Sequence, residues 1–176
     1  ASKLVNKRGE GLLLDIVLGV FGAVIGGWIF RALGTAGATG GGPGFTIPLP
    51  AGAKPSGGGG TELRFRWNNR LLIVDRSNSP QADAYQDWKT QESARRGGYR
   101  SYSLIRLDRV KYRDYESAAD WEFLYTTDSG NAQHAVKRNI RVDSSAAYSL
   151  SWYTTPQDWA ASQSDLQLLY QGFQPK

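Results

Sequence analysis

The sequence predicts an α+β protein in which one N-terminal transmembrane helix precedes an antiparallel sheet of about seven strands packed by two helices. An almost uninterrupted apolar run extends from Leu12 to Leu33, whereas alternating or mixed patterns follow Phe45. The alternations have the period of strands, and two segments carry helix start signals. The chain therefore divides into a transmembrane helix with a basic flank (residues 1–34), a glycine-rich linker (35–44) and an α+β extracytoplasmic domain (45–176).

The segment Leu12–Leu33 is long enough to cross a bilayer. As a helix it would span about 33 Å, against a hydrocarbon core of about 30 Å. Asp15 would cost about 2.5 to 3.5 kcal/mol at the membrane centre, but it lies about one turn from the start of the segment. Basic residues precede the segment at Lys3, Lys7 and Arg8, and only Arg31 follows closely. The positive-inside rule therefore predicts a single-pass cell-membrane protein with a cytoplasmic N-terminus.

Small residues give this helix a surface on which a second helix could pack. Gly22 and Gly26 stand at the spacing that lets two helix backbones approach closely, as do Ala23 and Gly27. The predicted packing residues are Gly19, Gly22, Gly26 and Gly27. The expected partners are the lipid bilayer and a second copy of the helix, although a generic glycine-rich anchor explains the same residues.

The segment after the helix reads TAGATGGGPG and covers residues 35–44. Its glycines and proline disfavour a stable helix or a central strand, so we expect a flexible linker. A second tract, Gly57–Gly60, lies between two apolar stretches and is expected to be a hairpin or a loop inside the domain.

Strand and helix signals in the domain follow the order βββαββββα. The first three strands are marked by Phe45, Ile47 and Leu49, by Leu63, Phe65 and Trp67, and by Leu71–Val74. Pro80 and Asp83 open a helix that runs to about Arg96, before Gly97 and Gly98. The later strands are expected at 102–113, 121–125, 135–142 and 147–153, with a hairpin turn at 128–131. Thr155–Asp158 opens the closing helix along Trp159, Leu166, Leu169, Tyr170 and Phe173.

The composition excludes several kinds of site. Without cysteine there can be no disulfide, thiolate nucleophile or cysteine-based zinc site. The sequence also lacks the GxSxG, P-loop, HExxH and calcium-loop motifs. We therefore expect neither an enzyme nor a cofactor.

Three polar residues of the later strands are weighed as catalytic candidates. His134 is the only histidine and has no second histidine with which to share a metal, so we expect a structural or surface histidine. Asp120 and Glu122 share a strand face, as paired carboxylates of an unrecognised cell-wall hydrolase could. Salt bridges across the sheet explain the two carboxylates better, with Arg106, Arg109 or Lys137 as partners.

Five tryptophans suit a carbohydrate or peptide platform, but a compact core accounts for them better: Trp67, Trp88, Trp121, Trp152 and Trp159.

In two stretches, basic residues occupy alternate positions, which suggests a basic sheet face. One comprises Arg64 and Arg66, and the other comprises Arg109, Lys111 and Arg113. Together with the membrane helix, the second set predicts contact with anionic lipid or a cell-wall polymer rather than with nucleic acid. The net charge of +5 is spread over the chain and adds little to this.

Two stretches resemble known families. The run SKLVNKRGEGLLLDIVLGVFGAVIGGWIFRALG, within about residues 2–40, resembles the transglycosylase-associated small membrane proteins of bacteria, which implies a membrane location. Residues 45–175, with AADWEF at Ala118–Phe123 and TPQDW at Thr155–Trp159, resemble the extracytoplasmic C-terminal domain of bacterial membrane serine/threonine kinases. This second resemblance implies a PsbP-like fold, whose members mostly act as accessory or binding modules.

The sequence thus predicts a membrane-tethered, non-catalytic extracytoplasmic binding or sensing module. The alternative is a stress-associated membrane protein of the transglycosylase-associated type that oligomerises through its glycine-rich helix, with the C-terminal domain as a passenger.

Overall fold

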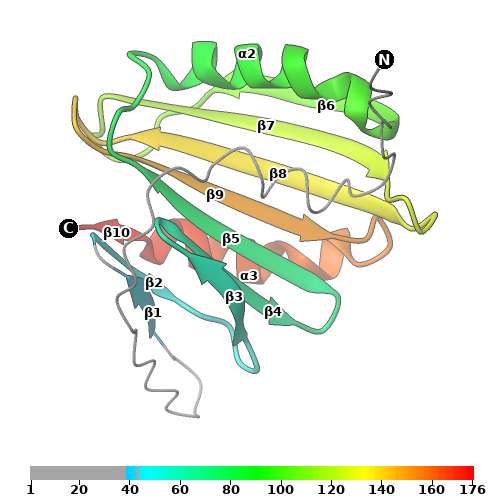
Figure 1. Cartoon of the computed structure of the whole chain (residues 1–176). Helices are drawn as coiled ribbons and strands as arrows, with labels where there is room; N and C mark the ends of the chain where they lie inside the picture. Colours follow the sequence, from blue (N-terminus) through cyan, green and yellow to red (C-terminus); the bar gives the residue numbers. More distant parts are fainter. Residues whose placement is uncertain (1–38, 43) are drawn as a thin grey trace, which may run out of the picture.

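The structure is a computed structural model that describes residues 39–42 and 44–176. A seven-stranded antiparallel sheet forms its centre (Figure 1). The strands, in their order across the sheet, are β3 (Lys54–Gly59), β4 (Glu62–Trp67), β5 (Arg70–Ser77), β9 (Ala147–Thr154), β8 (Ala132–Arg141), β7 (Ser117–Thr126) and β6 (Arg100–Arg109). Together with two α-helices, this sheet confirms the predicted α+β class.

A second, three-stranded sheet has the order β1 (Thr39–Gly42), β2 (Phe45–Pro48), β10 (Gln174–Pro175). Both outer strands pair antiparallel with β2. Residues from the two ends of the described chain thus lie side by side (Figure 1).

Two helices cover opposite faces of the large sheet (Figure 1). Helix α2 (Ala84–Arg95) continues into the 3-10 turn η1 (Arg96–Gly98) and packs on β6, β7 and β8. The carboxylate of Asp83 caps α2 by accepting a 2.9 Å hydrogen bond from the backbone N–H of Gln86, as its position before the helix predicts. Helix α3 (Trp159–Gly172) lies on the other face and contacts β9 and β2.

Polar contacts fix α3 to the hairpin between β4 and β5. The Arg70 side chain donates to Asp158 at 2.9 Å and to Asp165 at 2.5 Å. Gly172 lets the end of α3 approach β2, because a Cβ atom at this position would lie 2.2 Å from Pro48 Cγ. Both ends of α3 are therefore held close to neighbouring strands.

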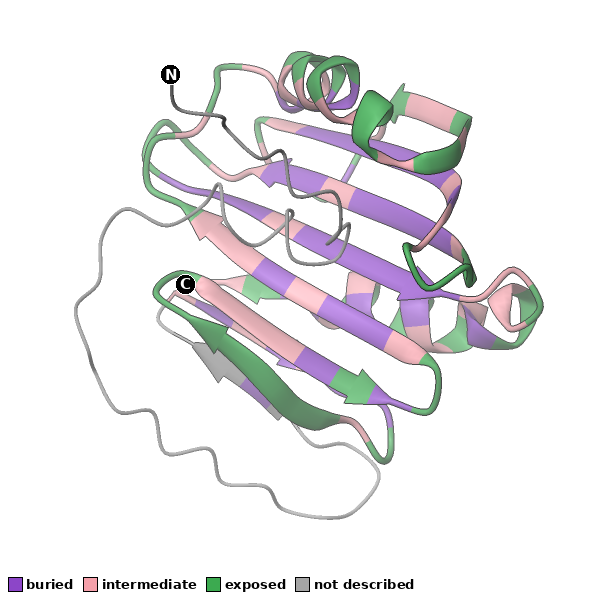
Figure 2. Cartoon of the chain, turned by 45° about the vertical axis from the view of Figure 1, so that its right-hand side comes forward, coloured by how far each residue is buried: buried purple, intermediate pink, exposed green. Residues whose placement is uncertain are grey.

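Alternate residues of the strands feed two cores, one on each face of the sheet. The core beneath α2 contains Leu71, Ala84, Trp88, Ala119, Trp121, Phe123, Tyr125, Ala135 and Tyr153. The core beneath α3 and the small sheet includes Phe45, Ile47, Phe65, Trp67, Leu72, Ile140, Leu150, Trp152, Leu169 and Phe173. Figure 2 shows buried residues concentrated along β7, β8 and β9. Four of the five tryptophans among the described residues are buried, so the interpretation as core residues is confirmed for these four.

The glycine-rich segment differs from the expected flexible linker. Thr39–Gly42 form β1 at the edge of the small sheet. Gly40 is buried so closely against Leu49 and Phe65 that an added Cβ atom would lie 2.9 Å from each side chain. Glycine permits this approach, which the sequence pattern does not reveal.

Two strands also differ from the sequence expectation. Phe45–Pro48 joins the small sheet, and its predicted place in the large sheet is taken by the glycine-rich β3. The extended segment predicted at 102–113 ends at Arg109 as β6. Beyond it the backbone turns, with Arg113 in the left-handed region at φ 53°.

The predicted transmembrane segment Leu12–Leu33 and its packing residues Gly19, Gly22, Gly26 and Gly27 lie outside the described residues. Among the helices that the structure describes, none is both long enough and apolar enough to cross a membrane. The membrane span and its orientation stay predictions.

Candidate functional site

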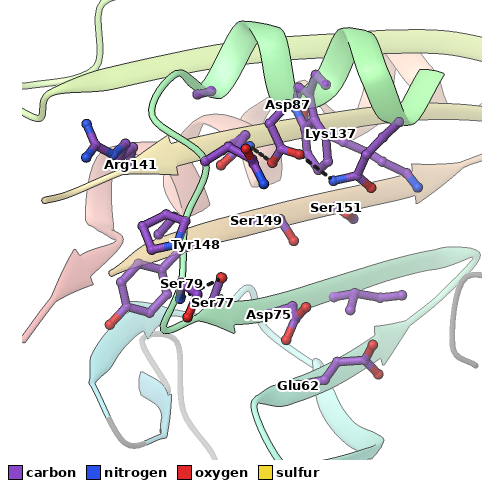
Figure 3. Close-up of a pocket in the computed structure, with 18 of the residues that line it drawn as sticks. Glu62, Asp75, Ser77, Ser79, Asp87, Lys137, Arg141, Tyr148, Ser149 and Ser151 are labelled. Atoms are coloured by element: carbon purple, nitrogen blue, oxygen red, sulfur yellow. Dashed lines mark hydrogen bonds between the residues drawn. The ribbon is translucent and has the colours of Figure 1, made fainter. Parts of the chain in front are cut away.

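A polar cavity of about 340 Å³ opens beside α2, where the helix leaves the strands β5 and β9 uncovered (Figure 3). Its floor comes from β5, β9 and β8, one side comes from α2, and Glu62 of β4 contributes to the other side. We call this cavity the α2 groove.

The floor of the α2 groove consists of residues that lie opposite one another across three strands. Asp75 on β5 pairs with Ser149 on β9, which pairs with Asn139 on β8. One row along, Ser151 on β9 pairs with Lys137 on β8. Directly opposite residues share a sheet face, so polar side chains replace the apolar ones expected beneath a covering helix.

Lys137 lies at the boundary between this groove and the core beneath α2. The residue is 5% exposed. Its ammonium lies 5.2 Å from the ring centroid of Trp121, 5.8 Å from that of Phe123 and 5.5 Å from that of Tyr153. Aromatic faces attract a cation, so these rings stabilise the partly desolvated charge.

The side of the groove formed by α2 is tied to β8 by side-chain hydrogen bonds. The carboxylate of Asp87 accepts from Asn139 at 2.7 Å and from Gln91 at 3.1 Å. The indole N–H of Trp88 donates to the backbone carbonyl of Lys137 at 3.0 Å. These bonds hold both the helix and the polar floor in place.

Two carboxylates stand together on the opposite side of the groove. Glu62 and Asp75 are direct cross-strand neighbours. Glu62 Oε1 accepts a 2.5 Å bond from Arg64, and Asp75 Oδ1 accepts a 2.7 Å bond from the hydroxyl of Thr61. Like charges directly opposite destabilise a sheet, so a cation between them would be favourable.

Arg141 lines one end of the groove. Its Nη1 donates to Glu116 and, at 3.1 Å, to the carbonyl of Ala82. Its Nε is buried and has no hydrogen-bond acceptor among the residues that the structure describes. Since a buried donor without an acceptor costs about 1 to 3 kcal/mol, an acceptor supplied by a ligand would be stabilising here.

The residues of the α2 groove were not predicted from the sequence. Polar residues at every second position of β8 (137, 139, 141) and of β9 (149, 151) were the available signal, which is clearer in β9 because that strand is otherwise largely apolar. That pattern does not indicate which strands of the sheet α2 leaves uncovered.

Asp120 and Glu122 face the other side of the sheet, beneath α3. Asp120 accepts two bonds of 2.7 Å from Arg138 and one of 3.0 Å from Arg106. Glu122 accepts a 2.7 Å bond from Arg106 and lies 2.8 Å from Nε2 of His134. The predicted salt bridges therefore form with Arg106, and Arg138 is a partner that was not predicted from the sequence.

The other two partners proposed for these carboxylates lie elsewhere. Arg109 forms its ion pair with Asp83. Lys137 pairs in register with Trp121, so it occupies the opposite face from Asp120 and Glu122. Period-two alternation along β8 accounts for this difference.

His134 is a packed, hydrogen-bonded histidine, in agreement with the structural interpretation. It is 7% exposed, and its ring stacks on Trp159 with 3.5 Å between centroids and 11° between planes. Its bond to Glu122 extends the ion-pair network that starts at Arg138. This cluster therefore connects β6, β7 and β8 to the start of α3.

We expect Glu122 to contribute to stability above acidic pH. Burial alone would raise the pKa of Glu122, but hydrogen bonds from His134 and Arg106 outweigh it and lower the pKa below 4.5. A lowered folded-state pKa adds stability at pH values above the unfolded pKa, and this stability is lost as the pH falls through the folded value. In urea titrations from pH 6 to pH 3, Glu122→Gln should therefore lose less stability than the unmodified chain.

Asp108→Asn, at an exposed position of β6, is the control. Equal losses in the unmodified chain and Glu122→Gln would contradict the prediction.

The predicted basic face of Arg109, Lys111 and Arg113 does not form as one strand face, because β6 ends at Arg109. Arg113 instead donates to the backbone carbonyl of Gln171 at 2.6 Å, close to the end of α3. Contact of these residues with an anionic surface stays a prediction.

Several solved structures share this fold. Cyanobacterial PsbP from Synechocystis matches with a TM-score of 0.61 and 15% identity, over 85% of this chain and 98% of that one. LpqN of Mycobacterium tuberculosis, involved in cell envelope biogenesis, has a TM-score of 0.53 and 7% identity over 77% of this chain and 87% of its own. The Ran-binding protein Mog1p of Saccharomyces cerevisiae has a TM-score of 0.51 and 12% identity over 74% of this chain and 89% of its own. At these identities the likenesses show the PsbP-like fold alone.

Comparison at the level of sequence is more specific. Residues 41–175 match the family model described as the serine/threonine kinase C-terminal domain. No curated protein matches the chain. The match begins after the stretch that resembles transglycosylase-associated proteins, so that resemblance stays a prediction.

Proposed function

Because the chain belongs to the serine/threonine kinase C-terminal domain family, we propose that it is a non-catalytic binding module whose ligand enters the α2 groove. Kinase chemistry would need a glycine-rich loop, a VAIK lysine and the HRD and DFG motifs, and none of these occurs in the sequence. Binding without chemical conversion is compatible with both the family and the fold.

The polar floor of the α2 groove is the observation that carries this proposal. Ser149, Ser151 and Asn139 share the sheet face next to α2, where a covered sheet would bury apolar residues. The cavity of about 340 Å³ falls at the small end of the range for small-molecule sites, which is about 300 to 1,000 Å³. A small polar ligand suits both the size and the lining.

The location belongs to the same proposal. The apolar run Leu12–Leu33 would hold the module at the outer face of a bacterial cell membrane, with the lipid bilayer as its first partner. The basic residues before the run and the resemblance to extracytoplasmic kinase domains support this orientation.

The alternative assigns the main role to the membrane segment, which would self-associate through Gly22 and Gly26. Replacing both glycines with isoleucine separates the two proposals. Only self-association through this segment predicts that the double variant loses its oligomeric state in detergent while the C-terminal domain keeps its thermal unfolding midpoint.

Protease protection in oriented membrane vesicles tests the location. Because exposed connections are cut first, external protease should release an intact fragment that contains residues 39–176. Protection of the whole chain from external protease would contradict the proposed topology.

A groove-filling variant tests the binding function. Ser149→Leu would place an apolar side chain on the groove floor, whereas Ser93→Leu makes the same change at an exposed position of α2 outside the groove. In a thermal-shift screen of small polar compounds, ligands at 100 times their Kd should stabilise the unmodified chain and Ser93→Leu by about 2.7 kcal/mol. They should not stabilise Ser149→Leu. Compounds that stabilise all three chains equally would place the binding site elsewhere.

A further inference from the structure

We propose that the α2 groove binds a zwitterionic peptide of about three residues, with its amino group against Glu62 and Asp75 and its carboxylate against Arg141. This inference rests on the proposed binding function and specifies the class of ligand.

The charges of the groove are separated across its width. The β4–β5 side carries the carboxylates of Glu62 and Asp75, whereas the cations lie on the β8 side, at Lys137 and Arg141, and on α2, at Arg95. Asp87 also lies on the α2 side, but its carboxylate already accepts from Asn139 and Gln91. A ligand with one positive and one negative end therefore fits this lining better than a polyanion or an apolar molecule.

Each charged side has hydrogen-bonding capacity left for a ligand. Glu62 and Asp75 each have one carboxylate oxygen in the bonds to Arg64 and Thr61, and the second oxygen of each can accept from an ammonium. An ammonium between these cross-strand neighbours would also relieve their mutual repulsion. On the other side, the buried Nε of Arg141 has no acceptor among the described residues, and a carboxylate would supply one.

The width of the groove sets the length of the ligand. Strand β9 lies between β5 and β8, so the strands that carry Asp75 and Arg141 are two interstrand spacings apart, or about 10 Å. An extended chain advances about 3.3 to 3.6 Å per residue, so about three residues join the two sides. A single amino acid is too short to reach both.

The floor provides groups that can bond to a peptide backbone. Ser149 and Ser151 lie on β9, midway between the charged sides, and both line the cavity. A hydroxyl can donate to a carbonyl and accept from an N–H, so two hydroxyls suit the alternating groups of a peptide.

Calorimetric titration of the whole 176-residue chain in detergent tests the inference. The probes are trialanine with free ends, N-acetyl-trialanine, trialanine amide and dialanine. We expect trialanine to bind at least tenfold more tightly than each of the other three. Equal affinity for free and blocked peptides would overturn the inference.

A pair of variants tests the orientation. Glu62→Gln combined with Asp75→Asn should weaken trialanine at least tenfold and leave the affinity for N-acetyl-trialanine unchanged. Asp108→Asn combined with Asp114→Asn makes the same charge change at exposed positions outside the groove and should leave both affinities unchanged. A general structural defect would weaken both peptides alike, and that result would count against the assigned amino-group contact.

Two other probes separate failure of this inference from failure of the proposed function. If chitotriose or inorganic phosphate binds the unmodified chain but not Ser149→Leu, and trialanine does not bind, the peptide inference is overturned while the binding function stands. If trialanine binds equally to the unmodified chain and Ser149→Leu, the assignment to the α2 groove is overturned.

Discussion

Replacing Asp120 with alanine should lower the free energy of unfolding by about 3 to 5 kcal/mol, the usual loss when one partner of a buried ion pair is removed. The side chain of Asp120 is 1% exposed and accepts three hydrogen bonds from two arginines. Without it, Arg138, whose side chain is 15% exposed, keeps its charge beneath α3 and loses its carboxylate partner.

Urea denaturation of Asp120→Ala and Asp108→Ala measures this effect. Asp108 is the cross-strand neighbour of Asp120 on β6, but it is exposed, so its replacement should change stability by no more than about 0.5 kcal/mol. Similar small losses in both variants would show that the network beneath α3 contributes little to the fold.

Trp121→Ala should cost about 3 to 5 kcal/mol, because truncating a large buried aromatic side chain leaves a cavity. Trp121 is 1% exposed and lies 5.9 Å from Trp88 and 4.7 Å from Phe123 between ring centroids. Its indole also donates to the hydroxyl of Tyr102 at 3.0 Å and supports the ammonium of Lys137. The substitution therefore removes packing beneath α2 and one of the rings next to the α2 groove.

Trp159→Ala is the matched control for this variant. Trp159 begins α3 and is only partly buried, so the same truncation removes less apolar surface from the core. Thermal unfolding should show a clearly smaller loss for Trp159→Ala. A loss at Trp159 equal to that at Trp121 would mean that the contact with His134 supports the fold as strongly as the core beneath α2.

Elements with strong local signals could be predicted from the sequence. Asp83 marked the start of α2, and the alternation at Trp121 and Phe123 marked β7. Strands that depend on distant partners could not be predicted in the same way. Thr39–Gly42 and Gln174–Pro175 carry few side chains suited to strands and are ordered by pairing with β2.

The candidate sites were predictable to different degrees. Pairing of Asp120 with Arg106 follows from strand faces and was predicted, because β6 and β7 are neighbours both in the sequence and in the sheet. The α2 groove depends on which strands α2 leaves uncovered and on the meeting of β5 with β9, which are far apart in the sequence. Its residues can be recognised only once the sheet order is known.

The pairing of β2 with β10 has a consequence for the order of folding. The paired residues lie roughly 130 positions apart, so their contact closes one of the longest loops in the domain and is entropically costly to form early. Hairpins such as β7–β8 close short loops and can form first, whereas a protein with many distant pairings folds slowly. Strand β2, with the apolar side chains of Phe45 and Ile47, would therefore stay without its final cover until late in folding. During that interval its apolar side chains would be open to association with another chain.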